Sequence, residues 1–585
     1  MGGGHGLDGG NPVKGTFPQD ECLYGGDELS HLSCLPCILR WVFQNGMAGI
    51  RPLVPPRRRL YCAYPDKLRH VALMTWVKLG DHIVAQGISG KVSMKLTANC
   101  AMSKSCETRH RRGAILTLLS FAMLIVSLDQ YIVVVALPEI ARDLGYSPQT
   151  LQSVVSAYAI ASSGFLLLGG RASDLLGRRR VLLFGLFLYC GASLAGGLAT
   201  SPIQQLAARA VQGLGGAFVF PSTLALINVR FPEGEERNWA LGVWAGAGAA
   251  GLVIGVLLGG ALTSAFGWRS VFLVNVPLAL FAIAAALVLI EADGIIDRSR
   301  AFDLPGAATV TSSITLLVIA LVEGPNLGWL SFSTIGLLLT GVALGVAFMI
   351  IEKRSGDPLL PLAMLENAWL RLALVVAALF MATFGALLYF LSIYFQDVLR
   401  YDALQTGFAF LLPTAVVVAS SALAGRAVTR FGLRPTMIAS LAIGALGALL
   451  LGITLRSDAS FLALVPGLIA TGVGDGMMFT ALFIAAATGV PDRQQGVASG
   501  MVSTGQGVGA AVGLAILVLI ANAAIHGIGN EELHIAKAQG IAHAAYAIAG
   551  GIVLTLLIVF AFRDPSAVNR RKRLPHRICT SNELI

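Results

Sequence analysis

Charged side chains are scarce in this chain. They make up 13% of its 585 residues, about half the share found in a soluble globular protein. Hydrophobic residues account for 55%, and the mean hydropathy is +0.74. This balance excludes a soluble globular protein and predicts a polytopic, all-α integral membrane protein.

The sequence also lacks the local signatures of several enzymes and pumps. It contains no HExxH motif, no glycine-rich phosphate loop followed by Lys and Ser or Thr, and no paired catalytic acids outside the apolar segments. These absences argue against a membrane enzyme or receptor and against an ATP-driven pump. The formal net charge of +10 is explained by loops and tails, so we expect no nucleic-acid partner.

Cysteine is rare outside the first 110 residues, which hold six of the eight. Cys34 and Cys37 form a CxxC pair, but a zinc site usually needs a second closely spaced pair, so we expect no metal site. No signal peptide is visible. Because residues 1–110 contain no apolar run of span length, we interpret them as a cytoplasmic extension that is either disordered or the product of a start codon assigned too far upstream.

Long apolar segments are abundant. A helix rises about 1.5 Å per residue, so about 20 mainly apolar residues cross the roughly 30 Å hydrocarbon core. Fourteen segments of this kind are predicted as transmembrane helices; the alternative is twelve, without the pair near Gly306 and Thr334, which is close to the minimum length and flanked by Gly and Pro. The fourteen begin near Gly113, Leu151, Val181, Ile203, Trp239, Val271, Gly306, Thr334, Leu370, Thr406, Pro435, Phe461, Ser499 and Ile541.

Lys and Arg are distributed unevenly among the predicted loops. Loops on one side carry about fifteen of them, and loops on the other side carry about five. Because cytoplasmic loops retain positive charge, the richer side is predicted to be cytoplasmic. Basic residues flank the first and last spans on this side as well. We therefore predict a multi-pass protein of the cell membrane, embedded in the lipid bilayer with both termini in the cytoplasm.

An internal repeat connects two parts of the chain. GRASDLLGRRRV at residues 170–181 and GRAVTRFGLRPT at residues 425–436 are degenerate copies, about 255 residues apart. Two glycine triplets have nearly the same offset, and small residues four apart allow helix backbones to pack closely. The triplets are Gly251, Gly255 and Gly259 in the fifth span and Gly505, Gly509 and Gly513 in the thirteenth. Parallel repeats of this kind characterise a class of secondary transporters.

The shift of eight spans between the copies predicts the domain organisation. Residues 111–291 form an N-terminal six-helix bundle, and residues 366–563 form a C-terminal one. An inserted helix pair and a cytoplasmic linker occupy residues 292–365. Residues 564–585 are a basic cytoplasmic tail.

Several motifs resemble those of a known family. The loop at residues 170–181 is similar to the signature loop between helices 2 and 3 of the major facilitator superfamily. Markers of its fourteen-helix drug:proton antiporter branch resemble LDQYIVVVALP at 128–138, RAVQGLGGAFVFP at 209–221, WRSVFLVNVP at 268–277 and EGPNLGW at 323–329. The resemblance, which covers about residues 112–563, implies the major facilitator fold and proton-coupled export of amphipathic drugs or antibiotics. A proton gradient then supplies the energy, and no cofactor is expected.

One position departs from the family pattern. The helix-5 motif usually has Gly-Pro where this chain has Gly255 and Val256. Proline removes a backbone donor and bends a helix. Val256 therefore leaves open the alternative that the chain imports or exports a specific small metabolite on the same fold.

Two charged residues lie deep in predicted spans and are candidates for proton coupling. Asp129 in the first span and Arg209 in the fourth each lie roughly 9 to 13 Å below the outer surface, so they can pair. A charge at such depth costs on the order of 3 kcal/mol and generally faces the bundle interior, where it finds a partner. In the functional interpretation Asp129 takes and releases a proton, and Arg209 and Gln212 set its proton affinity. The alternative is a structural ion pair between helices 1 and 4.

The loop at residues 170–181 is a candidate conformational lock. Gly170 and Gly177 permit a tight turn, and Asp174 is placed at the cytoplasmic surface, where it either caps the third helix or bridges to the arginines. Thr429 occupies the position of Asp174 in the second copy, so we expect a one-sided lock. The alternative is that the basic residues only fix the topology. The lock residues implied by the resemblance are Gly170, Arg171, Asp174, Gly177, Arg178 and Arg179.

Asp475 is a further acid inside a predicted span. Gly474 and Gly476 flank it and are expected to leave space beside its carboxylate. An anion there can attract a cationic drug or serve as a second proton site, or it can hydrogen-bond a neighbouring helix. The partners we expect are therefore protons and small amphipathic substrates, including cations, acting on a monomer.

Overall fold

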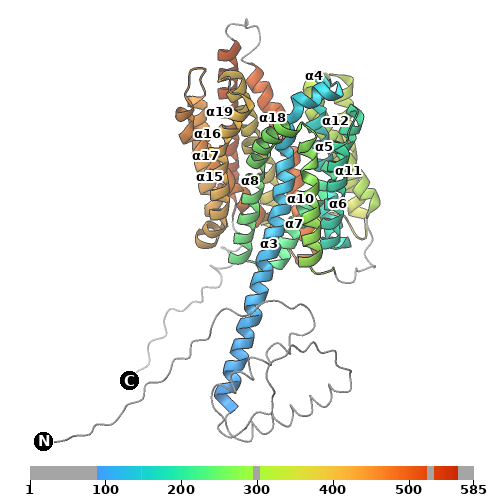
Figure 1. Cartoon of the computed structure of the whole chain (residues 1–585), viewed down its shortest axis with the longest axis vertical. Coiled ribbons are helices and arrows are strands. Elements are labelled where there is room, and N and C mark those ends of the chain that lie inside the picture. The colour runs from blue at the N-terminus through green and yellow to red at the C-terminus, as the bar shows by residue number, and fades with distance from the viewer. Residues whose placement is uncertain (1–88, 147, 294–302, 524–532, 564–585) are drawn as a thin grey trace, which may run out of the picture. The chain divides into compact units, whose positions relative to one another are not determined.

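The computed structural model describes residues 89–146, 148–293, 303–523 and 533–563, and the regular elements in these ranges are all helices. The chain divides into two units, 1–97 and 98–585. Within the described part of the second unit, fourteen helices are long and apolar enough to cross a membrane (Figure 1). The prediction of an all-α protein with fourteen spans is confirmed.

The first six spans form the amino half. They are α3 (Ser89–Leu144), α5 (Ser153–Leu176), α6 (Arg178–Gly197), α7 (Pro202–Arg230), α8 (Glu235–Phe266) and the pair α9 (Ser270–Leu273) with α10 (Asn275–Leu289). α3 is helical from Ser89, so part of the predicted extension, residues 89–110, is helical in its backbone. Residues 1–88 lie outside the described residues.

Two further spans, α11 (Leu304–Leu327) and α12 (Phe332–Arg354), follow the amino half and pack against each other. α11 also contacts α5 and α18. A non-helical stretch and the short helix η1 (Leu362–Glu366) then lead to the carboxyl half. The inserted pair therefore lies beside the seam between the halves.

The last six spans form the carboxyl half. The ninth combines α13 (Ala368–Phe380), η2 (Met381–Gly385), α14 (Ala386–Ile393) and η3 (Tyr394–Val398), and the others are α15 (Ala403–Phe431), α16 (Leu433–Thr454), α17 (Phe461–Ala487), α18 (Gln495–Ala523) and α19 (Leu533–Ala561). η2 and η3 are π-helical turns, which are often found at functional sites.

Local sequence explains several helix ends. Gly177 ends α5 and Gly432 ends α15, both with a positive φ that a residue with a Cβ rarely adopts. These glycines are 255 residues apart, as the repeat predicts. Ser201 accepts a hydrogen bond from the backbone of Gln204 and caps α7, and Asn367 caps α13 in the same way.

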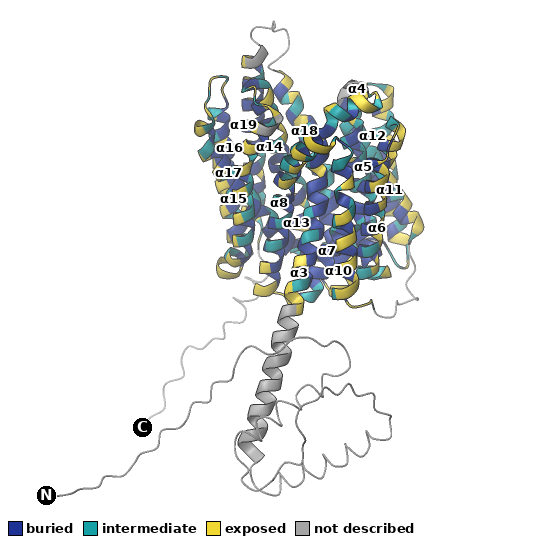
Figure 2. Ribbon diagram, viewed as in Figure 1, coloured by how far each residue is buried: buried dark blue, intermediate teal, exposed yellow. Residues whose placement is uncertain are grey.

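Burial separates the interior of the bundle from its periphery (Figure 2). Phe184, Phe187 and Phe281 are more than half exposed although they lie in spans. Large apolar side chains exposed around a bundle of apolar helices are suited to contact with lipid. Trp244 and Leu119, by contrast, are fully buried between the helices.

Candidate functional site

A buried polar network surrounds Asp129 of α3. Its carboxylate accepts hydrogen bonds from Arg209 Nη1 at 2.6 Å, from Gln212 Nε2 at 2.8 Å and from Asn275 Nδ2 at 2.9 Å. Asp129 and Asn275 are fully buried, and Arg209 and Gln212 are each 1% exposed. Three sequence-predicted residues thus meet at one point, where charge and hydrogen bonds compensate the buried carboxylate.

Arg209 is held from several sides. Its Nε donates to the backbone carbonyl of Val154, its Nη1 also donates to Gln212, and its guanidinium lies 4.6 Å from the ring centroid of Tyr158. Gln212 donates in addition to Ser193 of α6. These contacts tie α7 to α3, α5 and α6. A change in the charge of Asp129 therefore alters the contacts among four helices of the amino half.

Sequence reasoning missed Asn275 as a member of this network. Asn275 begins α10 within the motif WRSVFLVNVP. The signal available was an amide side chain inside an otherwise apolar span, since such groups need a hydrogen-bond partner in the membrane. Nothing in the local sequence identifies that partner as Asp129, which lies 146 residues earlier.

A cavity of about 50 Å³, enough for a few water molecules, lies between α8 of the amino half and the carboxyl half. α14, α15, α17 and the π-turn η2 supply the rest of its wall, including Phe384, Pro413 and Thr414. Among the described residues that line it, Asp475 alone is ionisable. Within the described residues, no hydrogen bond or ion pair to the Asp475 carboxylate is found.

The glycines around Asp475 serve a purpose other than the one we expected. A methyl group at Gly476 would overlap Ser420 and the backbone of α15, and one at Gly474 would lie 2.6 Å from Gly444 of α16. The glycines let α15 and α16 approach α17, so they are not the source of the space beside the carboxylate. With these two faces of α17 occupied, Asp475 is directed into the cavity.

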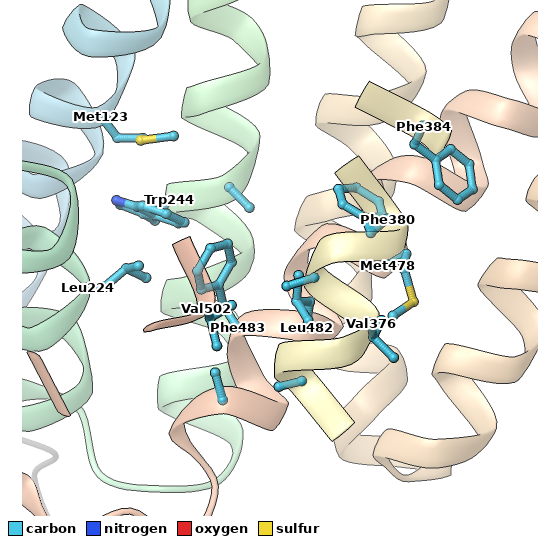
Figure 3. Packing of buried hydrophobic residues seen from close by; sticks show 14 of the residues in the cluster. Met123, Leu224, Trp244, Val376, Phe380, Phe384, Met478, Leu482, Phe483 and Val502 are labelled. Atoms are coloured by element: carbon cyan, nitrogen blue, oxygen red, sulfur yellow. The ribbon is translucent and has the colours of Figure 1, made fainter. Parts of the chain in front are cut away.

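The two repeated loops define one end of the bundle, which we call the loop face. An aromatic cluster of Phe220, Trp244, Phe479 and Phe483, which we call the aromatic plug, is drawn from both halves and lies farther along α17 toward this face than Asp475 does. Figure 3 shows Trp244 and Phe483 among the packed side chains. Ring centroids of Trp244 in α8 and Phe483 in α17 are 5.4 Å apart, Trp244 stacks on Phe479 at 6.1 Å, and Phe220 of α7 lies 5.2 Å from Trp244. Apolar packing across the halves therefore separates Asp475 from the loop face.

Asp174 joins the halves at the loop face. Its side chain is fully buried, and its carboxylate accepts hydrogen bonds from the backbone N–H groups of Gly496 at 3.0 Å and Val497 at 2.8 Å, at the start of α18. Nη2 of Arg178 lies 3.4 Å from Oδ1 of Asp174, and it also donates to the backbone carbonyl of Asp492. The expected surface position of Asp174 is therefore wrong, because the amino end of α18 covers and binds its carboxylate.

The amino end of the third span, α6, is capped by a residue other than Asp174. Asp293, beyond the end of α10, accepts hydrogen bonds from the backbone N–H groups of Arg179 at 3.2 Å and Arg180 at 2.9 Å. Arg179 also donates to the carbonyl of Leu287. Of the two roles expected for Asp174, capping of the third helix is excluded because Asp293 occupies that place.

Arg171 forms its ion pair with a residue outside the repeated loops. It is 1% exposed and forms an ion pair at 2.8 Å with Asp357, in the stretch that follows α12. The pair ties α5 to the linker that leads into the carboxyl half. Its two partners are 186 residues apart, so the sequence gives no indication of the pairing.

The second repeated loop also docks across the seam. A methyl group at Gly170 would overlap the carbonyl oxygen of Gly496, and one at Gly425 would overlap that of Asn238. Asn238 Nδ2 donates to Thr429 Oγ1 at 3.1 Å. We expected such a contact only at the first loop, but both loops contact the opposite half, the first through a charged side chain and the second through a neutral one.

The glycine triplets lie at equivalent interfaces in the two halves. A methyl group at Gly255 would overlap the backbone of Leu128 in α3, and one at Gly509 or Gly513 would overlap the backbone of Ala378 or Ala382 in the ninth span. Gly251 and Gly259 also face the backbone of α3 closely. Gly505 is the exception, since the nearest atom would be 3.5 Å away. The fifth and thirteenth spans thus pack on the first span of their own halves.

Comparison with known proteins identifies the family. The Major Facilitator Superfamily model matches residues 119–514 and 372–578. The chain belongs to the major facilitator superfamily. This is a family of transporters, and its fold accounts for the two six-helix halves.

Two curated relatives are named as drug-resistance proteins. The multidrug resistance protein Stp of Mycobacterium tuberculosis is 36% identical over 409 residues, which cover 69% of this chain and 75% of the relative. The puromycin resistance protein pur8 of Streptomyces alboniger is 34% identical over 463 residues, covering 78% of this chain and 92% of the relative. The resemblance that we derived from sequence motifs is confirmed.

Solved structures share the fold at low identity. The human organic anion transporter MFSD10 superposes with a TM-score of 0.57 at 16% identity, covering 77% of this chain and 99% of that one. The proton:xylose symporter XylE also gives a TM-score of 0.57, at 14% identity, covering 78% and 96%. At these identities the likeness supports the fold alone.

Proposed function

We propose that this chain is a proton-coupled secondary transporter that exports amphipathic drugs or antibiotics by alternating access. The observation that carries the proposal is a cavity between two repeated halves that is separated from one face by contacts both loops make. The names of the relatives, a multidrug resistance protein and a puromycin resistance protein, support drug export. A cephamycin export protein of Amycolatopsis lactamdurans, 33% identical over 451 residues that cover 75% of this chain and 88% of the relative, supports the direction.

The loop face is cytoplasmic in this proposal. Support comes from the basic residues of the first loop, Arg178, Arg179 and Arg180, because positive charge is retained on the cytoplasmic side. The cavity is then closed toward the cytoplasm in this structure. To load a substrate from inside, the halves separate at the loop face, which breaks the Asp174 contact with α18, the Asn238–Thr429 hydrogen bond and the packing of the aromatic plug.

The Asp129 network supplies the coupling. Protonation of Asp129 removes the negative charge that compensates Arg209, and the buried guanidinium then needs other acceptors. Because these side chains join α3, α5, α6 and α7, proton binding alters how the helices of the amino half pack. One proton moving through 100 mV gains about 2.3 kcal/mol. No cofactor enters the cycle, and the transporter acts as a monomer.

Transport in everted membrane vesicles tests the proposal. With a pump-deficient host as background, vesicles containing the chain are expected to accumulate a fluorescent amphiphile when an inward-acid pH gradient is imposed, and a protonophore should abolish the accumulation. A resistance panel in the same host then identifies the substrates. Vesicles that show no gradient-dependent accumulation of any compound in the panel would refute proton-coupled drug export.

A second candidate is transport of a specific small metabolite on the same fold. One observation favours it, namely Val256 at the position where the antiporter motif usually has proline. α8 is a continuous helix from Glu235 to Phe266, and a side-chain carbon of Val256 would lie 3.1 Å from a methyl group at Gly407 of α15. Val256→Pro is therefore expected to bend α8 at this contact. Net drug uptake by energised cells, in place of efflux, would favour the metabolite importer.

A further inference from the structure

Asp475 differs from the other acids found deep in the bundle. Asp129 accepts three side-chain hydrogen bonds, and Asp174 accepts two from backbone N–H groups and pairs with Arg178. Glu352 accepts one from the backbone of Leu360. Asp475 has no such partner among the described residues. An ionised carboxylate inside a membrane is costly, so Asp475 is stabilised either by a proton or by a positive charge that a substrate brings from outside the protein.

The surroundings of Asp475 are apolar. Its cavity is lined by Leu, Val, Ala, Pro, Gly and Phe side chains and by two threonines. One of these, Thr471, donates its hydroxyl to the backbone of its own helix. The site thus presents one negative charge and an apolar wall. The aromatic ring of Phe384 is part of this wall. A singly charged lipophilic cation matches both features, since its charge meets the carboxylate and its apolar body meets the wall.

The amino half also faces this acid. Tyr131 of α3 is near enough for an electrostatic interaction with Asp475, and Ala249 and Leu252 of α8 line the same cavity. A cation held beside Asp475 therefore touches both halves. Asp129, enclosed by Arg209, Gln212 and Asn275, does not line the cavity.

We propose that Asp475 is the charge-recognition residue for cationic substrates, which bind as singly charged lipophilic cations at the cavity between the halves once separation of the halves enlarges it beyond its volume of about 50 Å³ in this closed arrangement. This inference rests on the proposed function, because it names the substrate class of the exporter. It also separates two roles, with the proton taken up at Asp129 and the cargo's charge bound at Asp475. Substrates without a positive charge bind the same apolar wall and do not depend on Asp475.

Binding and transport of two probes test the proposal. Tetraphenylphosphonium carries a permanent positive charge, and Nile red is neutral. Asp475→Asn is expected to weaken tetraphenylphosphonium binding to the purified protein about tenfold or more, since a close charge pair in the bundle is lost, and to leave Nile red transport at the wild-type rate. Asp475→Glu should restore cation binding. Asp458→Asn is the matched control, because Asp458 is 75% exposed and paired with Arg456.

A measurement on the wild-type chain avoids any dependence on folding of the variants. Dicyclohexylcarbodiimide modifies carboxyl groups in apolar surroundings, and peptide mass spectrometry locates the adduct. Tetraphenylphosphonium is expected to protect Asp475 from modification, and Nile red is not expected to do so at a matched occupancy. Equal modification of Asp475 with and without the saturating cation would overturn the proposal.

The outcomes separate this inference from the proposed function. If the wild type exports neither probe nor any compound of the resistance panel, drug export fails as a function. If it exports panel compounds but neither binds nor exports tetraphenylphosphonium, only the assignment of Asp475 fails. If the wild type exports both and Asp475→Asn binds and exports tetraphenylphosphonium as well as the wild type does, the assignment of Asp475 fails while drug export stands. Loss of both probes in Asp475→Asn, with a normal gel-filtration profile, would also overturn the assignment, because it would show a role that does not depend on cargo charge.

Discussion

Arg209 Nη1 lies 2.6 Å from a carboxylate oxygen of Asp129, and neither side chain is more than 1% exposed. The two residues belong to α7 and α3 and are 80 positions apart. Removal of one partner of a buried pair is costly, since it leaves an uncompensated buried charge. Any step that changes the charge of Asp129 therefore changes the packing of these helices.

Asp129→Asn is expected to abolish uptake driven by a pH gradient in everted vesicles, because the amide cannot take up and release the coupling proton. The loss of one partner also destabilises the protein, by about 3–5 kcal/mol for a buried pair, so thermal unfolding is measured alongside. Asp129→Glu keeps the charge and should retain part of the coupled transport. Gradient-driven uptake at the wild-type rate in Asp129→Asn would remove Asp129 from the coupling scheme.

The two loop contacts are expected to differ in strength. Hydrogen bonds to a charged group are roughly twice as strong as neutral ones, so Asp174→Asn should open the loop face more than Thr429→Val does. Spin labels at the exposed positions Arg180 and Arg493, one in each half, report the separation by pulsed electron resonance. We expect a longer mean distance in Asp174→Asn and a smaller shift in Thr429→Val. The same distance distribution in Asp174→Asn and the wild type would contradict the lock.

The glycine triplet in α18 contains its own control. A methyl group at Gly509 would overlap the backbone of Ala378, whereas one at Gly505 would be 3.5 Å from the nearest atom. Gly509→Ala should destabilise the protein by about 1–3 kcal/mol, as overpacking does. Gly505→Ala should be neutral or stabilising, because alanine is favoured over glycine in a helix. Thermal unfolding of the purified variants checks this, and equal midpoints for the two would show that this helix contact is not tight.

The spans were predictable because hydropathy is a local property. Twelve of the fourteen predicted starts fall within four residues of the starts of the spanning segments, while those near Ser499 and Ile541 are later than the spanning segments' starts at Asp492, just before α18, and at Ile535, within α19. The thirteenth span begins with polar and small residues: Gln495 is buried against α7 and the end of α17, and Gly496 against α5, so neither faces lipid. Hydropathy measures the preference for lipid, so it misses a helix end that packs on protein.

The candidate site was predictable only in part. Asp129 and Arg209 stood out because a charge in a span needs a partner, and their depths matched. Asn275 and Ser193 did not stand out, since neutral polar residues in spans are common and usually bond to their own helix. Asp174 was identified as a lock residue from the family resemblance, but its partner at Gly496 and Val497 is a pair of backbone N–H groups, which have no residue type that a sequence could reveal.

The sequence by itself determined that this is a membrane protein with fourteen spans, and it determined the duplicated halves and the family. These features depend on composition, on local hydropathy and on motifs with fixed spacing. Only the tertiary structure decided which groups meet across the seam. It placed Thr429 opposite Asn238, Arg171 opposite Asp357, and Asp475 in the cavity with no hydrogen-bond partner among the residues that the structure describes. Such contacts join residues far apart in the chain, and their energy depends on helix rotation and depth, which local sequence does not specify.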